Sequence, residues 1–177
     1  RWLIMSVLSS TRSRSEMTAS GTCSVLPPPK MAGAFCGACL VYLLFKDQFD
    51  ATEDAATKRG VFCTAPAVRN IPRNILSEAV GTFVLVFAIK GLAQVPDLAD
   101  GTGKFLVFAI IVSVGMSLGG LTGYAINPAR DLGPRLAHAV LPIQGKGSSD
   151  FGYGLVVPIV GPILGALAAV LVYGLIF

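Results

Sequence analysis

Residues Gly120–Pro134 read GLTGYAINPARDLGP, and this stretch decides how the rest of the chain is interpreted. It combines an Asn-Pro pair with an Arg-Asp pair and lies between two long apolar segments. Asn127 is a suitable N-cap, and Pro128 at the first helical position lacks only an N–H that the helix does not need. The stretch therefore predicts a helix from Pro128 to about Leu141, about 14 residues and about 21 Å long.

The composition indicates a membrane protein. Of 177 residues, 53% are hydrophobic and 14% are charged, and the mean hydropathy is +0.69. A soluble domain usually carries about 25% charged residues. We expect an all-α membrane protein, because a helix satisfies its own backbone polar groups in lipid. The net charge of +4 is scattered along the chain without a basic stripe, which argues against a nucleic-acid partner.

Four apolar segments are the candidate spanning helices: Met31–Phe45, Ile75–Val95, Phe105–Leu118 and Tyr153–Phe177. The first is short for a span, and the three prolines before it make an earlier helix start unfavourable. Residues 46–74 are mixed in charge and are expected to form a solvated loop. The sequence QVPDLADGTGK, at residues 94–104, is expected to be a tight link between the second and third segments.

The helix predicted at Pro128 is too short to cross a hydrocarbon core of about 30 Å. We therefore expect a half-helix that starts inside the membrane, after an extended segment that lines a cavity or is buried in protein. The carbonyl groups of Gly123, Tyr124 and Ala125 would accept hydrogen bonds. The Asn127 amide would donate, and Arg130 would present a fixed fork of donors. Because the helix N-terminus is partly positive and repels cations, the arrangement suits a neutral, hydroxylated solute.

Several alternatives stay open at this point. An Asn-Pro pair alone is a common turn signal, so Arg130 and Asp131 could form an ion pair at the membrane interface instead of lining a pore. Glu78, near the start of the second segment, is either an interfacial helix carboxylate or a buried acceptor for loop N–H groups. Gly115 is either a helix-packing residue or a residue kept small to widen a constriction.

The cysteine and histidine patterns do not indicate a catalytic or metal site. Cys36 and Cys39 form a CxxC inside an apolar run without a second pair, so we interpret them as small residues on a helix face. His138 is the only histidine, which excludes a cluster of His ligands. Without a nucleophile–base pair or paired carboxylates, we expect no enzymatic activity, no metal and no cofactor.

The segment GYAINPARDLGP resembles the second NPA box of the major intrinsic proteins, and specifically of the glycerol uptake facilitators, or aquaglyceroporins. Upstream, MAGAFCGACLVY is similar to the third helix of that family, and downstream, VVPIVGPILGA is similar to the sixth. The resemblance covers about residues 31–177. It implies an incomplete aquaporin-like helical bundle with about four spanning helices and one re-entrant half-helix.

The resemblance also implies roles for individual residues. Asn127 would donate to a permeant hydroxyl at the pore centre, and Arg130 would do so at the outer constriction. Gly115 aligns with a filter position in the fifth helix, and Tyr124 aligns with an aromatic that packs along the glycerol backbone. Glu78 would brace the motif loop.

Positions that separate glycerol channels from water-selective channels in this family match the glycerol type here: Asp131, Arg135, Pro158 with Ile159, Gly115 and Tyr124. Pro128 and Ala129 complete the NPA motif and, with Asp131, support it. The implied function is a passive, multi-pass channel of the plasma membrane for glycerol, other small neutral solutes and water. A complete chain would assemble as a homotetramer.

The chain departs from the family in having one Asn-Pro pair, where an intact member has two NPA boxes. Residues 1–30 do not resemble the missing half, and we expect them to be a disordered or foreign tail. Residues 31–177 are then the carboxy-terminal part of a channel domain, in a truncated copy that does not conduct on its own. The alternative is a membrane-embedded structural or interaction fragment without transport activity.

Overall fold

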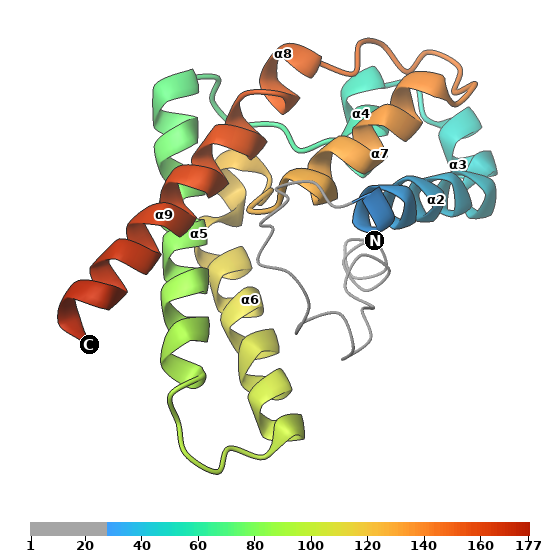
Figure 1. Cartoon of the computed structure of the whole chain (residues 1–177). Helices are drawn as coiled ribbons and strands as arrows, with labels where there is room; N and C mark the ends of the chain where they lie inside the picture. Colours follow the sequence, from blue (N-terminus) through green and yellow to red (C-terminus); the bar gives the residue numbers. More distant parts are fainter. Residues whose placement is uncertain (1–27) are drawn as a thin grey trace. The chain divides into compact units, whose positions relative to one another are not determined.

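The computed structural model describes residues 28–177, which form helices joined by turns and loops, with no strand among them. Residues 1–27, which hold most of the tail expected at residues 1–30, lie outside the described part. The chain divides into two compact units, and Figure 1 labels their helices. Among the described residues, unit 1 contains residues 28–63 together with Asn127–Gly154, and unit 2 contains Thr64–Ile126 together with Leu155–Phe177.

The helices in chain order are α2 (Pro28–Leu44), α3 (Lys46–Ala51), α4 (Ala55–Phe62), α5 (Ile71–Leu92), α6 (Asp100–Thr122), α7 (Pro128–Val140), α8 (Phe151–Gly154) and α9 (Val157–Ile176). Three helical stretches are apolar and long enough to cross a membrane, namely Ile71–Leu92, Asp100–Thr122 and Phe151–Ile176. The remaining segment that the sequence offered as a span is α2, an apolar helix of 17 residues.

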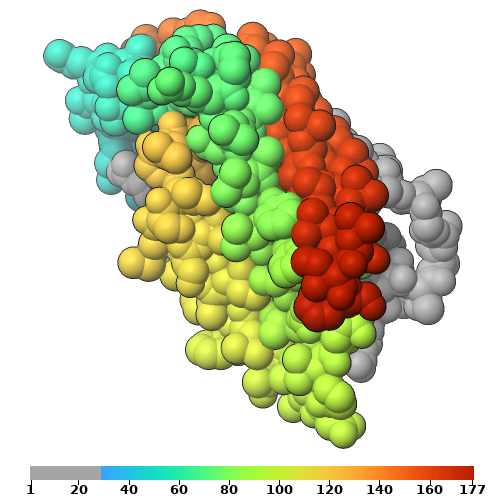
Figure 2. All heavy atoms as spheres, turned by 90° about the vertical axis from the view of Figure 1, so that its left-hand side faces the viewer, coloured from blue at the N-terminus to red at the C-terminus, as the bar shows by residue number. Residues whose placement is uncertain are grey.

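In unit 2, α5 packs against both α6 and α9, and Figure 2 shows α9 lying along α5. Two glycines of α9 make this packing close. A Cβ atom on Gly161 would lie 2.5 Å from the Cβ of Glu78, and one on Gly165 would overlap the carbonyl oxygen of Ala79. Small residues four positions apart let two helix backbones approach closely in lipid, where dispersion and hydrogen bonds replace the hydrophobic effect.

In unit 1, α7 packs against α2. The close point is Gly133, where a Cβ atom would lie 2.7 Å from the Cβ of Ala34. The core beside this contact is aromatic: the Phe49 ring centroid is 5.6 Å from that of Tyr42 and 5.5 Å from that of Phe62. These rings come from α2, α3 and α4, so three helices share one core that supports α7.

The stretch at residues 46–74 is not the plain solvated loop that the sequence predicted, because it contains α3 and α4 and the start of α5. Asp54 caps α4 by accepting two backbone N–H groups, at 3.2 and 2.8 Å. Phe49 and Phe62 are buried in the unit 1 core. Most charged side chains of this stretch are exposed, whereas Lys58 is buried together with the two aromatic side chains.

Two helix starts also differ from expectation. Helix α2 begins at Pro28 rather than near Met31, because the first turn of a helix has N–H groups without intrahelical partners and so tolerates proline. Helix α6 begins at Asp100, inside the link expected at residues 94–104. The Lys104 ammonium lies 2.9 Å from the Asp100 carboxylate one turn away and supports that first turn.

The last apolar segment is interrupted rather than continuous. Helix α8 ends at Gly154, and α9 begins at Val157. Pro158, the second residue of α9, has no N–H with which to continue the hydrogen-bond ladder from α8.

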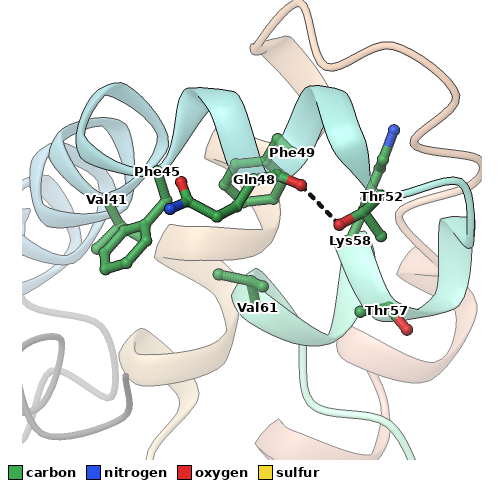
Figure 3. A pocket seen from close by; sticks show the side chains of 8 residues that line it. All are labelled: Val41, Phe45, Gln48, Phe49, Thr52, Thr57, Lys58 and Val61. Carbon is green, nitrogen blue, oxygen red and sulfur yellow. Dashed lines mark hydrogen bonds between the residues drawn. The ribbon is translucent and has the colours of Figure 1, made fainter.

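A small cavity lies between α2, α3 and α4 (Figure 3). Its volume is about 30 Å³, which leaves room for one or two water molecules. The side chains that line it are Val41, Phe45, Gln48, Phe49, Thr52, Thr57, Lys58 and Val61. These include none of the residues predicted to line a pore, so the cavity is separate from the predicted permeation site.

Candidate functional site

Helix α7 begins at Pro128 as predicted, and Asn127 is its N-cap. Asn127 Oδ1 accepts the N–H of Ala129 at 3.0 Å, and the Asn127 carbonyl accepts the N–H of Arg130 at 3.1 Å. Because the helix holds Oδ1, the Nδ2 group is directed away from the helix backbone. The predicted cap is confirmed, and the role of Nδ2 as a donor to a permeant stays a prediction.

Residues 123–126 connect α6 to α7 without helical structure. Gly123, Tyr124 and Ile126 have φ angles of 80°, 61° and 41°. A left-handed φ is strained at Tyr and still more at a β-branched Ile, so the surroundings must hold this loop in shape. Glycine is required at 123 for its φ and for space, because a Cβ atom there would lie 3.1 Å from the backbone nitrogen of Ala65.

The Glu78 carboxylate of α5 holds the loop. Its side chain is buried, with the residue 1% exposed, and it accepts hydrogen bonds from Thr122 Oγ1 (2.5 Å), Ala125 N (3.0 Å) and Ile126 N (2.6 Å). A trans peptide places its N–H and C=O on opposite sides, so the carbonyls of Tyr124 and Ala125 point away from Glu78. The structure therefore agrees with the buried-acceptor interpretation of Glu78. Glu78 thus sets the direction of two of the three carbonyl groups that were predicted to accept hydrogen bonds, those of Tyr124 and Ala125.

Gly115 of α6 packs against the Tyr124 ring. A Cβ atom at 115 would lie 3.2 Å from the ring atoms Cε1 and Cζ of Tyr124. The Tyr124 hydroxyl donates to the carbonyl of Ile111, one turn earlier in α6. Of the two interpretations left open for Gly115, the packing contact is observed, and an effect on the width of a constriction stays a prediction.

Asp131 forms a buried bidentate pair with Arg135. Its two carboxylate oxygens accept from Arg135 Nε at 2.7 Å and Nη2 at 2.8 Å, and both residues are 0% exposed. This buried partner differs from the interfacial Arg130–Asp131 pair that the sequence left open. Such fork-to-carboxylate geometry combines two charge-assisted hydrogen bonds and fixes the orientation of both side chains.

Sequence reasoning missed the polar network that continues from this pair. Arg135 Nη1 donates to the carbonyls of Ser149 and Asp150, at 2.5 and 3.0 Å. His138, for which the sequence offered no partner, has its Nδ1 2.8 Å from Ser149 Oγ. The i,i+4 spacing of Asp131 and Arg135 is a sequence signal for their pairing, whereas the contacts to Ser149 depend on the fold of a loop.

The predicted site residues divide between the two units. Unit 1 contains Asn127, Pro128, Ala129, Arg130 and Asp131, and unit 2 contains Glu78, Gly115, Gly123, Tyr124 and Ala125. Within unit 2, the structure brings Glu78 to the loop and Gly115 to Tyr124. Among residues 28–177, no three His, Cys, Asp or Glu side chains gather where they could hold a metal ion.

Helix α7 and the loop at residues 123–126 lie within a segment of the chain that matches a known family. Residues 29–173 match the family model described as "Major intrinsic protein". The chain belongs to the major intrinsic protein family. Its apolar helices and this membership make it an integral membrane protein, and the family is one of channels and transporters rather than of enzymes.

Relatives within the major intrinsic proteins are close in sequence. The chain is 50% identical over 148 residues to the "Probable glycerol uptake facilitator protein" of Thermotoga maritima, covering 84% of this chain and 62% of the relative. It is 49% identical over 154 residues to the "Glycerol uptake facilitator protein" of Streptococcus pneumoniae, covering 86% and 65%. The chain thus spans slightly less than two thirds of the length of these relatives.

A solved structure shares the fold. The aquaglyceroporin from Plasmodium falciparum superposes with a TM-score of 0.66 at 23% identity, over 82% of this chain and 60% of that one. The expectation of an incomplete aquaporin-like helical bundle is confirmed by this likeness and by the all-helical structure of the described residues.

Proposed function

We propose that this chain supplies the carboxy-terminal part of a passive channel for glycerol, other small neutral solutes and water in the plasma membrane. The observation that carries the proposal is the loop at residues 123–126, which Glu78 holds so that two carbonyls point away from the brace. The next residue along the chain, Asn127, caps a half-helix with a partly positive N-terminus. Carbonyl acceptors in the loop are thus followed along the chain by donors at the start of α7, whose positive N-terminus repels cations. This combination suits a neutral polyol.

Each predicted residue has a defined part in this channel. Asn127 donates to a permeant hydroxyl at the pore centre, and the half-buried Arg130 donates at the outer constriction. Gly115 and Tyr124 contribute the apolar surface along which the carbon backbone of the solute passes. Pro128 and Ala129 shape the start of α7, Asp131 fixes it through Arg135, and neither a cofactor nor covalent chemistry is involved.

We also propose that these 177 residues do not conduct when they are reconstituted alone, and that complete subunits assemble as homotetramers. A loop that lines a cavity in a whole channel would face lipid where that cavity is not enclosed. Each unsatisfied backbone group there costs several kcal/mol. The proposal is supported by the finding that the chain spans less than two thirds of the length of each of these relatives.

The test compares proteoliposomes that contain the chain alone with vesicles that contain a completed channel. In the completed channel, the amino-terminal part of the Thermotoga maritima relative is fused before Pro29. We expect glycerol uptake only from the completed channel, with the chain alone matching empty vesicles. A folded completed channel that takes up no glycerol would contradict the proposed function, and uptake by the chain alone would contradict the second proposal.

A residue-level arm uses Arg130→Ala in the completed channel, with Arg73→Ala as the control because Arg73 is exposed at the start of α5. Loss of the guanidinium should alter the preference among polyols and water, since a fixed donor fork is removed from the constriction. Unaltered permeant preference in Arg130→Ala would remove Arg130 from the proposed filter.

A further inference from the structure

The ten residues that follow α7, Leu141–Asp150, are here called the strap. Side chains from three helices of unit 1 bind its carbonyl oxygens: Tyr42 binds Pro142 (3.2 Å), Lys58 binds Gln144 (2.6 Å), and Arg135 binds Ser149 (2.5 Å) and Asp150 (3.0 Å). Lys58 and Arg135 are buried. A loop with so many of its acceptors engaged by buried donors is a fixed element of unit 1.

Lys146 lies in the strap and reaches back to the end of α7. Its Nζ donates to the carbonyls of His138 and Ala139 at 2.8 Å each and of Leu141 at 2.6 Å. The last carbonyls of a helix have no intrahelical partners. A cation placed there satisfies them and also interacts favourably with the negative end of the helix dipole. Lys146 is therefore the C-terminal cap of α7.

The strap backbone is shaped to bring Lys146 to this position. Gly145 and Gly147, on either side of Lys146, have φ angles of 63° and 68°. Glycine adopts such left-handed angles without the steric cost that other residues incur. Two left-handed residues that flank one lysine reverse the chain and direct its side chain to the helix end.

Helix α7 is consequently held at three places along its length. Near its start, Gly133 packs on Ala34 of α2. Farther along, the buried Arg135, which is paired with Asp131, links the helix to the far end of the strap. At its C-terminus, Lys146 binds the helix to the middle of the strap. A shift of α7 along its axis requires both links to the strap to yield.

We propose that Lys146 is a positioning residue for the half-helix, and that by capping its C-terminus it fixes the place of Asn127 and Arg130 at the other end. Helix α7 runs without a break over 13 residues, with Pro134 inside it, and Gly133 beside that proline is packed on Ala34, so a movement of its last turn is passed on to its first. The inference rests on the proposed channel function and assigns part of the solute selectivity to a residue outside the NPA motif.

The first experiment measures hydrogen exchange in this chain in detergent micelles and requires no conduction. Lys146→Met removes the cap, Lys146→Arg keeps the cation and its donors, and Lys104→Met removes an exposed lysine from an i,i+4 pair as the control. The amide of Leu141, bonded to Ala137 O at 2.9 Å, should exchange about tenfold faster in Lys146→Met, the size expected for losing a charge-assisted hydrogen bond. Lys146→Arg and Lys104→Met should exchange as the parent chain does.

The second experiment measures glycerol and water permeability for the same variants in the completed channel. A positioning role predicts that Lys146→Met lowers the glycerol-to-water permeability ratio several-fold and that Lys146→Arg restores it. A purely structural role would lower both permeabilities together and leave the ratio constant. If Lys146→Met does not fold, Lys146→Gln, which is neutral but retains a donor, takes its place in both experiments.

The outcomes separate the two proposals. Unchanged exchange at Leu141 in Lys146→Met overturns the cap itself. Faster exchange with an unchanged permeability ratio overturns the positioning role. A completed parent channel without glycerol uptake overturns the channel function, and the exchange result then still decides whether Lys146 caps α7.

Discussion

The hydroxyl of Thr122 donates to the Glu78 carboxylate at 2.5 Å, which joins the last residue of α6 to the buried face of α5. The bond lies where α6 ends and the left-handed loop begins. It also places the carboxylate within reach of the N–H groups of Ala125 and Ile126. One acidic side chain thus sets both the end of α6 and the direction of the loop carbonyls.

Replacing Glu78 with glutamine should destabilise the protein. Glutamine offers one acceptor oxygen and turns an NH₂ group towards donors that the carboxylate now accepts, and a buried donor left unsatisfied costs about 1–3 kcal/mol. We expect a lower midpoint of thermal unfolding in detergent for Glu78→Gln. Glu53→Gln is the matched control, because Glu53 is exposed. Equal midpoints for Glu78→Gln and the parent chain would show that the loop does not depend on the carboxylate.

Helix α9 offers a test of the close α5–α9 contact. An added methyl at Gly165 meets the backbone oxygen of Ala79, which cannot move aside as a flexible side chain can. Gly165→Ala should therefore lower stability by about 1–3 kcal/mol, the usual cost of overpacking. At Gly174 in the same helix, nothing lies within 4 Å of an added Cβ atom, so Gly174→Ala should be neutral or slightly stabilising. Thermal unfolding of both variants tests this prediction. Equal destabilisation of the two variants would show that Gly165 is not the point of close contact between α5 and α9.

Gly115→Ala should act on permeation through Tyr124. The new methyl would lie 3.2 Å from the Tyr124 ring, so the ring must shift by a few tenths of an ångström. Overpacking of about 1 kcal/mol corresponds to about a fivefold change, and we expect glycerol permeability of the completed channel to fall by this factor relative to water. Gly120→Ala, on the same helix with open space around it, is the control. Identical glycerol-to-water permeability ratios in the two variants would show that Gly115 does not act on the solute path.

Asp54 gives a pH-dependent prediction for α4. The Thr57 hydroxyl, together with the backbone N–H groups of Thr57 and Ala56, holds the pKa of Asp54 below its ordinary value of 3.8. Because the folded-state pKa is lowered, the contribution of this cap is complete above pH 3.8 and is lost as the pH falls through the lowered pKa. Hydrogen-exchange protection of the first α4 amides should decline over that window. Asp54→Asn, a neutral cap, should show no such decline, and a matching decline in both would assign it to another group.

Features set by adjacent residues could be predicted from the sequence. The start of α7 was placed correctly because Asn127 and Pro128 act on backbone groups within three positions of themselves. The pairing of Asp131 with Arg135 has an i,i+4 signal of the same local kind. The helical bundle could be predicted from the family resemblance, because the motif and the segments that flank it match the family pattern in register over most of the chain.

Features that depend on distant contacts could not be predicted in the same way. Glu78 meets residues of the loop that lie far along the chain, so its burial was one of two open alternatives. The helices α3 and α4 depend on Phe49 and Phe62 joining a core with α2, which a charge pattern cannot reveal. The cap from Lys146 requires a chain reversal at Gly145 and Gly147, and their left-handed backbone is a property of the folded strap.

The polar character of α7 has a consequence for biogenesis. Within 13 residues the helix carries Arg130, Asp131, Arg135 and His138, and each Arg or Asp at the centre of a segment disfavours release from the translocon by about 2.5–3.5 kcal/mol. Alone, α7 is thus a poor substrate for co-translational insertion, whereas α5 and α6 are long and apolar enough to partition directly. The proposed channel therefore requires α7 to enter the bilayer after α5 and α6, with Asp131 and Arg135 already paired and α2 in contact with it.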